Sequence, residues 1–185
     1  MKTTTTIVAF LLCTIILFNC KKPEPVIVNE EELITTLTYT LTSTSDTIIC
    51  KFKDADGDGG SAPVITVSKA LTPNILYKGS LELLDESGPT PENINTEIEE
   101  EDEAHQFFFK NETGLNITTT YDDLDGNQKP IGLKTNVQTG NASTGKLKIT
   151  LRHEPNKNGA NVAQGDITNA GGETDIEVEF DLTIQ

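Results

Sequence analysis

The sequence predicts an all-β protein, specifically an immunoglobulin-like antiparallel β-sandwich of about eight or nine strands. Thr is abundant, aromatic residues make up only 5% of the chain, and Gly, Asn, Asp and Pro interrupt it at short intervals. This composition is typical of strands joined by turns. Several segments alternate strictly between apolar and polar residues, and no amphipathic helix of ten or more residues is evident. Two sheets packed face to face would bury the apolar sides of such strands.

Three segments show the alternation most clearly, and their apolar positions predict the core. These positions are Leu33, Leu37, Tyr39 and Leu41; Leu147, Ile149 and Leu151; and Ile176, Val178, Phe180, Leu182 and Ile184. Thr, Lys, Glu or Asp occupy most of the positions between them, so each strand has one polar face and one buried face.

The same pattern places candidate strands along the whole domain. They span about 33–43, 46–53, 63–69, 75–84, 94–100, 105–112, 115–121, 130–138, 146–154 and 174–184, of which one or two would merge or be absent. Residues 155–173 show no alternation. We expect them to form a long functional or crossing loop with room for one helical turn.

The N-terminus has the features of an export signal. A lysine near the start is followed by an apolar run over 7–18, which is too short to span a bilayer comfortably. The run ends at Cys20, with Leu17 three residues before it, a spacing similar to the lipobox of bacterial lipoproteins. Asn19 stands where that motif usually has Gly, Ala or Ser. We expect 1–19 to be removed and Cys20 to carry the lipid, palmitate included; the alternatives are an ordinary cleaved signal or an uncleaved anchor.

Residues 20–32 are rich in Pro and charge and are expected to form a flexible tether to the folded domain, 33–185. The whole chain has a formal net charge of −15. Such a charge repels nucleic acid and anionic membrane surfaces, so neither is an expected partner. It favours cations, or a basic patch on another protein. The lipid on Cys20 would then be the contact with the outer membrane, on its periplasmic face or at the cell surface.

The cysteines argue against a disulfide framework. Cys13 would leave with the signal and Cys20 would be acylated, so Cys50 is the single thiol left in the mature chain. Ile48, Cys50 and Phe52 share one face of a predicted strand, which predicts that Cys50 is an unreactive core residue.

One acidic segment resembles the first half of a calcium loop. Asp54, Asp56 and Asp58 alternate and are followed by glycine, which could bring three carboxylates around one ion. The position where an EF-hand needs its bidentate Glu is Ile65, and the flanks are strands, so an EF-hand is excluded. A calcium-stabilised turn and a solvated acidic hairpin turn both fit, and turn chemistry alone explains Asp and Gly. A weaker copy of the pattern lies at 123–127.

Both histidines of the chain are predicted at strand ends, on the buried side. His105 follows an acidic run and lies beside Glu103, while His153 is followed by Glu154. Two imidazoles and a carboxylate can hold Zn²⁺ or Cu²⁺ if the fold brings the two strands together. The alternative is two separate histidines, each hydrogen-bonded at the rim of the sandwich. Ring nitrogens more than about 5 Å apart could not share a zinc ion with bonds near 2 Å.

Catalytic sequence patterns are absent. The chain has no G-x-S-x-G, no H-E-x-x-H, no P-loop and no Gly-rich dinucleotide fingerprint. Pairs of carboxylates are common in any acidic protein and indicate no particular chemistry. We therefore expect a protein that is not an enzyme.

The lipobox, the acidic run ending in HQFFF, the stretch LRHEPNK and the terminal GDITNAGGETDIEVEF resemble a family of small lipoproteins from Gram-negative bacteria. The family carries the label of a type 1 periplasmic-binding fold superfamily and is associated with TonB-dependent outer-membrane receptors. The resemblance spans nearly the whole mature chain and implies no catalytic or ligand residues. Its fold label implies an α/β protein with a parallel sheet, whereas the period-two alternation favours antiparallel sheets.

Two functions are compatible with these observations. The first is an outer-membrane lipoprotein that binds a ligand, a metal or metal complex, as accessory to a TonB-dependent receptor. The second is a surface adhesion or scaffolding module, with or without calcium, that has no small-molecule ligand.

Overall fold

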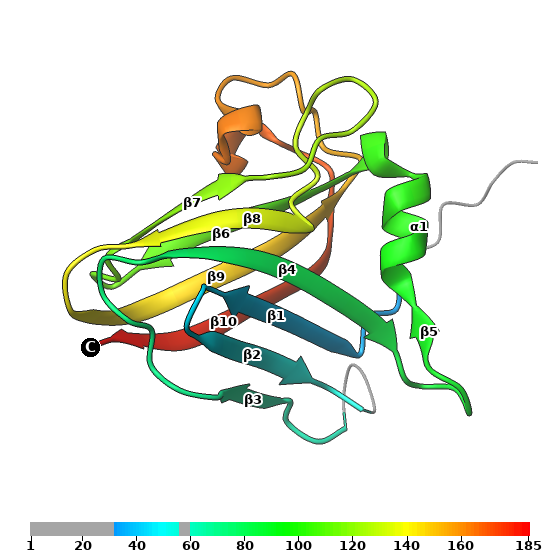
Figure 1. The fold of residues 1–185 in the computed structure, drawn as a ribbon. Helices are drawn as coiled ribbons and strands as arrows, with labels where there is room; N and C mark the ends of the chain where they lie inside the picture. The colour runs from blue at the N-terminus through cyan, green and yellow to red at the C-terminus, as the bar shows by residue number, and fades with distance from the viewer. Residues whose placement is uncertain (1–31, 56–59) are drawn as a thin grey trace, which may run out of the picture. The chain divides into compact units, whose positions relative to one another are not determined.

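The described residues form two antiparallel β-sheets, one of seven strands and one of three, packed face to face (Figure 1). The computed structural model describes residues 32–55 and 60–185. The larger sheet has the order β3-β2-β1-β4-β8-β7, with β5 paired to the end of β4, and the smaller sheet has the order β10-β9-β6. The prediction of an all-β sandwich is therefore confirmed.

The elements follow the predicted strands closely along most of the chain. Their bounds are β1 (Thr36–Thr42), β2 (Thr47–Lys53), β3 (Val64–Val67), β4 (Leu76–Asp85), β5 (Glu92–Asn93), α1 (Ile94–Glu100), η1 (Asp102–Ala104), β6 (His105–Glu112), β7 (Ile117–Tyr121), β8 (Lys134–Thr139), β9 (Ser143–His153), η2 (Val162–Gln164), η3 (Ile167–Asn169) and β10 (Glu173–Ile184).

The core lies between the sheets and consists of the apolar positions of the alternating strands. Tyr39 of β1 and Phe107 of β6 are fully buried, as is Phe180 of β10. Cys50 is also fully buried, as its position on the apolar face of β2 predicted. Leu33, by contrast, is 53% exposed. The chain enters β1 only at Thr36, so the alternation of the strand does not extend back to that residue.

The prediction of a strand over 94–100 is wrong, because this segment is a short helix. Asn93 caps α1 by accepting a hydrogen bond from the backbone N–H of Asn95. Ile94 and Ile98 lie four residues apart and are both buried, so one face of two helical turns packs on the sandwich. Figure 1 shows α1 at one end of the sheets. Within the described ranges no helix is long and apolar enough to cross a membrane.

The connection between β9 and β10 is long, as its lack of alternation led us to expect, but it contains two single 3₁₀ turns, η2 and η3, where we expected room for one helical turn. Val162 and Ala170 from this connection are fully buried and pack with Phe108 of β6 in a second, small apolar cluster. The connection is therefore fixed to the outer side of the three-stranded sheet. The α/β arrangement implied by the family label is not found in the described residues.

Candidate metal centre

The two histidines lie directly opposite each other in the smaller sheet. His105 is the first residue of β6 and His153 the last residue of β9, and the antiparallel register pairs them. His105 is completely buried and His153 is 3% exposed. Their imidazole rings stack, with centroids 4.5 Å apart and an interplanar angle of 26°. The condition set by the sequence, that the two strands meet at the histidines, is fulfilled.

Glu32 supplies a carboxylate to both imidazoles. Its Oε1 lies 2.7 Å from Nε2 of His105, and its Oε2 lies 3.8 Å from Nδ1 of His153. Glu32 is only 8% exposed, although the sequence placed it in the tether. It belongs to the folded domain. No periodicity precedes β1 to reveal this, because residues 32–35 follow an irregular path.

A backbone contact orients the His105 ring. Its Nδ1 lies 3.1 Å from the carbonyl oxygen of Glu101, and a carbonyl can only accept, so Nδ1 carries the proton. Nε2 lies 2.7 Å from the carboxylate of Glu32, which can also only accept, so without metal this nitrogen carries a second proton, and a bound metal ion would replace that proton. Metal-binding histidines are commonly held in this way, with one ring nitrogen donating to a backbone carbonyl and the other free to bind.

A second carboxylate, that of Asp175, lies beside His153. Its Oδ1 lies 3.9 Å from Nδ1 of His153, and its side chain is fully buried. Simple alternation from Ile176 would place Asp175 on the polar face of β10. The register between β9 and β10 shifts between Thr174 and Ile176, and this irregularity turns Asp175 inward.

Four residues from separate segments offer ligand atoms to one point. One atom each from Glu32, Glu101, His105 and His153 lies within 4.8 Å of the others. Two atoms bonded to the same zinc at about 2.1 Å stand at most about 4.2 Å apart. A small inward movement of these side chains would therefore complete a site with two nitrogen and two oxygen ligands. Such a set suits Zn²⁺ or Cu²⁺ and lacks the thiolates that favour Cu⁺.

The charges of the cluster stabilise an ion pair between His105 and Glu32. Burial disfavours the charged form of His105, but the hydrogen bond and charge of Glu32 outweigh burial and raise the pKa of His105. Burial also opposes ionisation of Glu32, yet His105 lowers the pKa of Glu32 below its usual value. Burial and the charges of Glu32, Glu101 and Glu92 raise the pKa of Glu97. Glu32, Glu97 and Glu101 place three carboxyl groups near the two imidazoles.

The two carboxylates that the sequence assigned to the histidines, Glu103 and Glu154, do not lie in the cluster. Glu154 has a φ of 48°, a left-handed conformation that ends β9 and leaves the side chain exposed. Glu103 lies in η1 and lines a separate cavity. Adjacency in sequence was a poor guide, because Glu103 lies in a 3₁₀ turn before β6 and the chain turns away from the sheet at Glu154.

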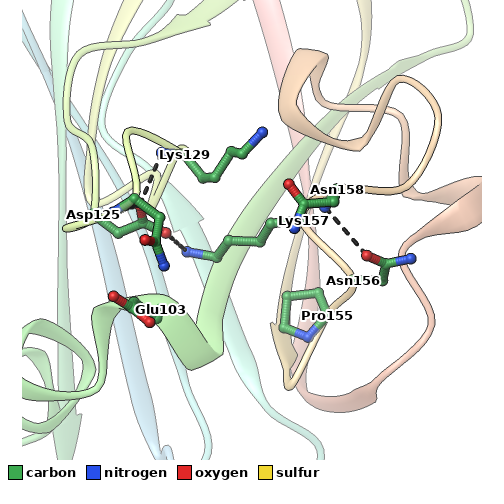
Figure 2. Close-up of a pocket in the computed structure, with 8 residues that line it drawn as sticks. Glu103, Asp125, Lys129, Pro155, Asn156, Lys157 and Asn158 are labelled. Carbon is green, nitrogen blue, oxygen red and sulfur yellow. Dashed lines mark hydrogen bonds and ion pairs between the residues drawn. The ribbon is translucent and has the colours of Figure 1, made fainter.

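That cavity, shown in Figure 2, has a volume of about 450 Å³ and is lined in part by charged side chains. Lys157, 6% exposed, extends its ammonium to Asp125 at 2.9 Å and to the carbonyl of Asp102 at 2.6 Å. The contact ties the loop after β9 to η1, the turn that leads into His105. The residues that line the cavity are Glu103, Asp125, Asn127, Lys129, Pro155, Asn156, Lys157 and Asn158.

The proposed calcium loop is only partly described. Asp54 follows β2, and its backbone N–H donates to the carbonyl of Thr35. Asp56 and Asp58 lie outside the described residues. In the weaker copy at 123–127, Asp123 accepts from the backbone N–H groups of Gly132 and Lys134, at 2.8 Å each. Those carboxylate oxygens are already used to close the loop.

In comparisons with family models, with curated proteins and with solved structures, nothing matches this chain. The fold and the cluster thus define the protein as a β-sandwich with a buried pair of histidines surrounded by carboxylates.

Proposed function

We propose that this protein is a lipid-anchored protein of the outer membrane that binds a divalent transition metal, Zn²⁺ or Cu²⁺, and is not an enzyme. The observation that carries the proposal is the direct opposition of His105 and His153 around the buried carboxylate of Glu32. In this proposal the ligands are His105, His153, Glu32 and Glu101.

Charge supports a bound cation more than a simple buried ion pair. A buried ion pair is favourable only when each charge is well compensated. Here the carboxylate of Glu32 approaches both imidazoles, and a carboxylate oxygen of Glu101 belongs to the same cluster. A divalent ion would neutralise these carboxylates and would replace the proton on Nε2 of His105, while the Glu101 carbonyl keeps the ring in place.

The cellular role rests on the sequence. The signal and the lipobox around Cys20 support anchoring by a lipid, and the acidic surface supports handling of cations. The resemblance to lipoproteins associated with TonB-dependent receptors supports a role as accessory to such a receptor. The metal, or a complex of it, would then be the ligand presented to the receptor.

Calorimetric titration of the full-length, chelator-treated protein in detergent tests the metal site. Zn²⁺, Cu²⁺ and Ca²⁺ are added in separate titrations. We expect one transition-metal ion to bind per chain, and His105→Ala and His153→Ala each to weaken binding about 100-fold or more, since removing a ligand should exceed the 10–100-fold typical of outer-shell changes. Circular dichroism verifies that each variant is folded.

Glu154→Gln and Glu103→Gln are the matched controls, because both residues are exposed and neither joins the cluster. Both variants should bind as the wild type does. If only Ca²⁺ gave heat of binding, the histidine site would be contradicted, and the loop that begins at Asp54 would become the candidate site. No binding of any of the three ions would overturn the proposal.

A further inference from the structure

The four proposed ligands differ sharply in their access to solvent. His105, His153 and Glu32 are at most 8% exposed. Glu101 is exposed, although one of its carboxylate oxygens belongs to the same cluster. A structural metal site is normally closed on all sides by protein, whereas a site that exchanges its ligands keeps one accessible position. In this cluster three ligands are buried, and the fourth, Glu101, is exposed to solvent.

The backbone of Glu101 is fixed even though its side chain is free to move in solvent. Its N–H donates to the carbonyl of Glu97 at 2.9 Å and so ends α1. Its carbonyl accepts from the N–H of Ala104 at 2.8 Å and from Nδ1 of His105 at 3.1 Å. The carboxylate is therefore presented at a constant place beside the histidines, while its own rotation needs no change in the fold.

We propose that Glu101 is the exchangeable ligand of this site, past which the metal enters and leaves, so that the bound ion is cargo and not a permanent structural part. This inference rests on the proposed function. The exposed acidic residues around Glu101 (Glu97, Glu99 and Glu100) would raise the local concentration of cations at that opening. The acidic residues around Glu101 would thus form the entrance for the metal, and the histidine pair would form its binding site.

Metal transfer to a competing chelator tests the inference. Full-length protein loaded with Zn²⁺ in detergent is mixed rapidly with increasing concentrations of the chromogenic chelator 4-(2-pyridylazo)resorcinol, and the rate of zinc transfer is recorded. If Glu101 yields its position to an incoming ligand, the rate rises with chelator concentration. Glu101→Ala, which removes the carboxylate but keeps the backbone contacts, should release zinc about tenfold faster or more, in line with the loss expected for a ligand.

Glu82→Ala is the matched control, because Glu82 is an exposed carboxylate on β4 that belongs neither to the acidic run around Glu101 nor to the four-residue cluster. It should release zinc at the wild-type rate. A release rate that is independent of chelator concentration and unchanged in Glu101→Ala would overturn the inference, since it describes a closed site that opens only by local unfolding. That result would leave the metal site itself in place. Failure of the wild-type protein to bind Zn²⁺ would instead overturn the proposed function, and this inference with it.

Discussion

The ammonium of Lys157 and the carboxylate of Asp125 form a buried ion pair, 2.9 Å long. The other oxygen of Asp125 accepts from the backbone N–H groups of Asn127 and Lys129. Lys157 also donates to the carbonyl of Asp102, so the pair joins three segments at the end of the sandwich where β6 begins.

Neutralising Asp125 should destabilise the protein in a pH-dependent way. Burial opposes ionisation of Asp125, but Lys157 and the two N–H groups outweigh burial and hold its pKa below the usual value. Its contribution to stability is therefore complete above the ordinary pKa of about 4 and is lost as the pH falls through the lowered pKa. Asp125→Asn, which leaves Lys157 buried without its countercharge, should reduce the free energy of unfolding by about 3 kcal/mol at pH 7.

Urea unfolding followed by circular dichroism at pH 7 and at pH 3 measures this effect. The difference in the free energy of unfolding between wild type and Asp125→Asn should narrow at pH 3, which lies below the ordinary pKa of about 4, because the unfolded chain then takes up a proton on Asp125 that the folded state holds less readily. Asp122→Asn is the control, because Asp122 pairs with Lys78 in solvent. This substitution should leave the free energy of unfolding nearly unchanged at both pH values. If Asp125→Asn lowered the free energy of unfolding equally at both pH values, the stabilising role assigned to the ionised carboxylate of Asp125 would be refuted.

Bound metal should raise the melting temperature. A ligand that binds the folded state alone adds about 2.7 kcal/mol to the free energy of unfolding at a concentration of 100 Kd. For a domain of this size, this corresponds to a rise of about 5–10 °C. Differential scanning calorimetry with Zn²⁺ should show the rise and its reversal by a chelator. His153→Gln should melt at the same temperature with and without Zn²⁺.

Gly79 occupies a position in β4 where a side chain does not fit. A Cβ there would collide with Oγ1 of Thr135 and lie 2.5 Å from the hydroxyl of Tyr39, two groups that hydrogen-bond to each other at 2.6 Å. Gly79→Ala should therefore lower the free energy of unfolding by about 1–3 kcal/mol, measured by urea denaturation. Gly88→Ala, which meets nothing closer than 3.8 Å, should be close to neutral.

Cys50 should be inert in the folded protein. Burial raises the pKa of its thiol to about 12, so the reactive thiolate is scarce at pH 8, and the side chain is fully buried. Iodoacetamide followed by peptide mapping in the mass spectrometer should find Cys50 unmodified under native conditions and alkylated in urea. Alkylation at equal rates in both conditions would contradict its place in the core.

The lipid anchor can be tested in a Gram-negative host. If Cys20 is acylated, labelled palmitate should be incorporated into the wild-type protein, and Cys20→Ala should abolish incorporation and release the protein from the membrane fraction. Cys13→Ala should retain the label, because Cys13 would leave with the signal. Incorporation that survives Cys20→Ala would contradict the lipobox assignment.

The sequence by itself determined the all-β class, nine of the strands and the burial of Cys50, His105 and His153. All of these follow from one local rule, that successive residues of a strand point to opposite faces. It could not identify α1 as a helix, because two buried isoleucines four residues apart over seven residues are too short a pattern to distinguish from a strand.

Only the tertiary structure decided which carboxylates meet the histidines. The register of β6 on β9 sets His105 opposite His153, a pairing of residues 48 positions apart that no local pattern encodes. Glu32 arrives from an irregular segment, Asp175 through a register shift, and Glu101 from the end of a helix. Each of these depends on where one segment packs against another, which is fixed by the burial of the whole core and not by neighbouring residues.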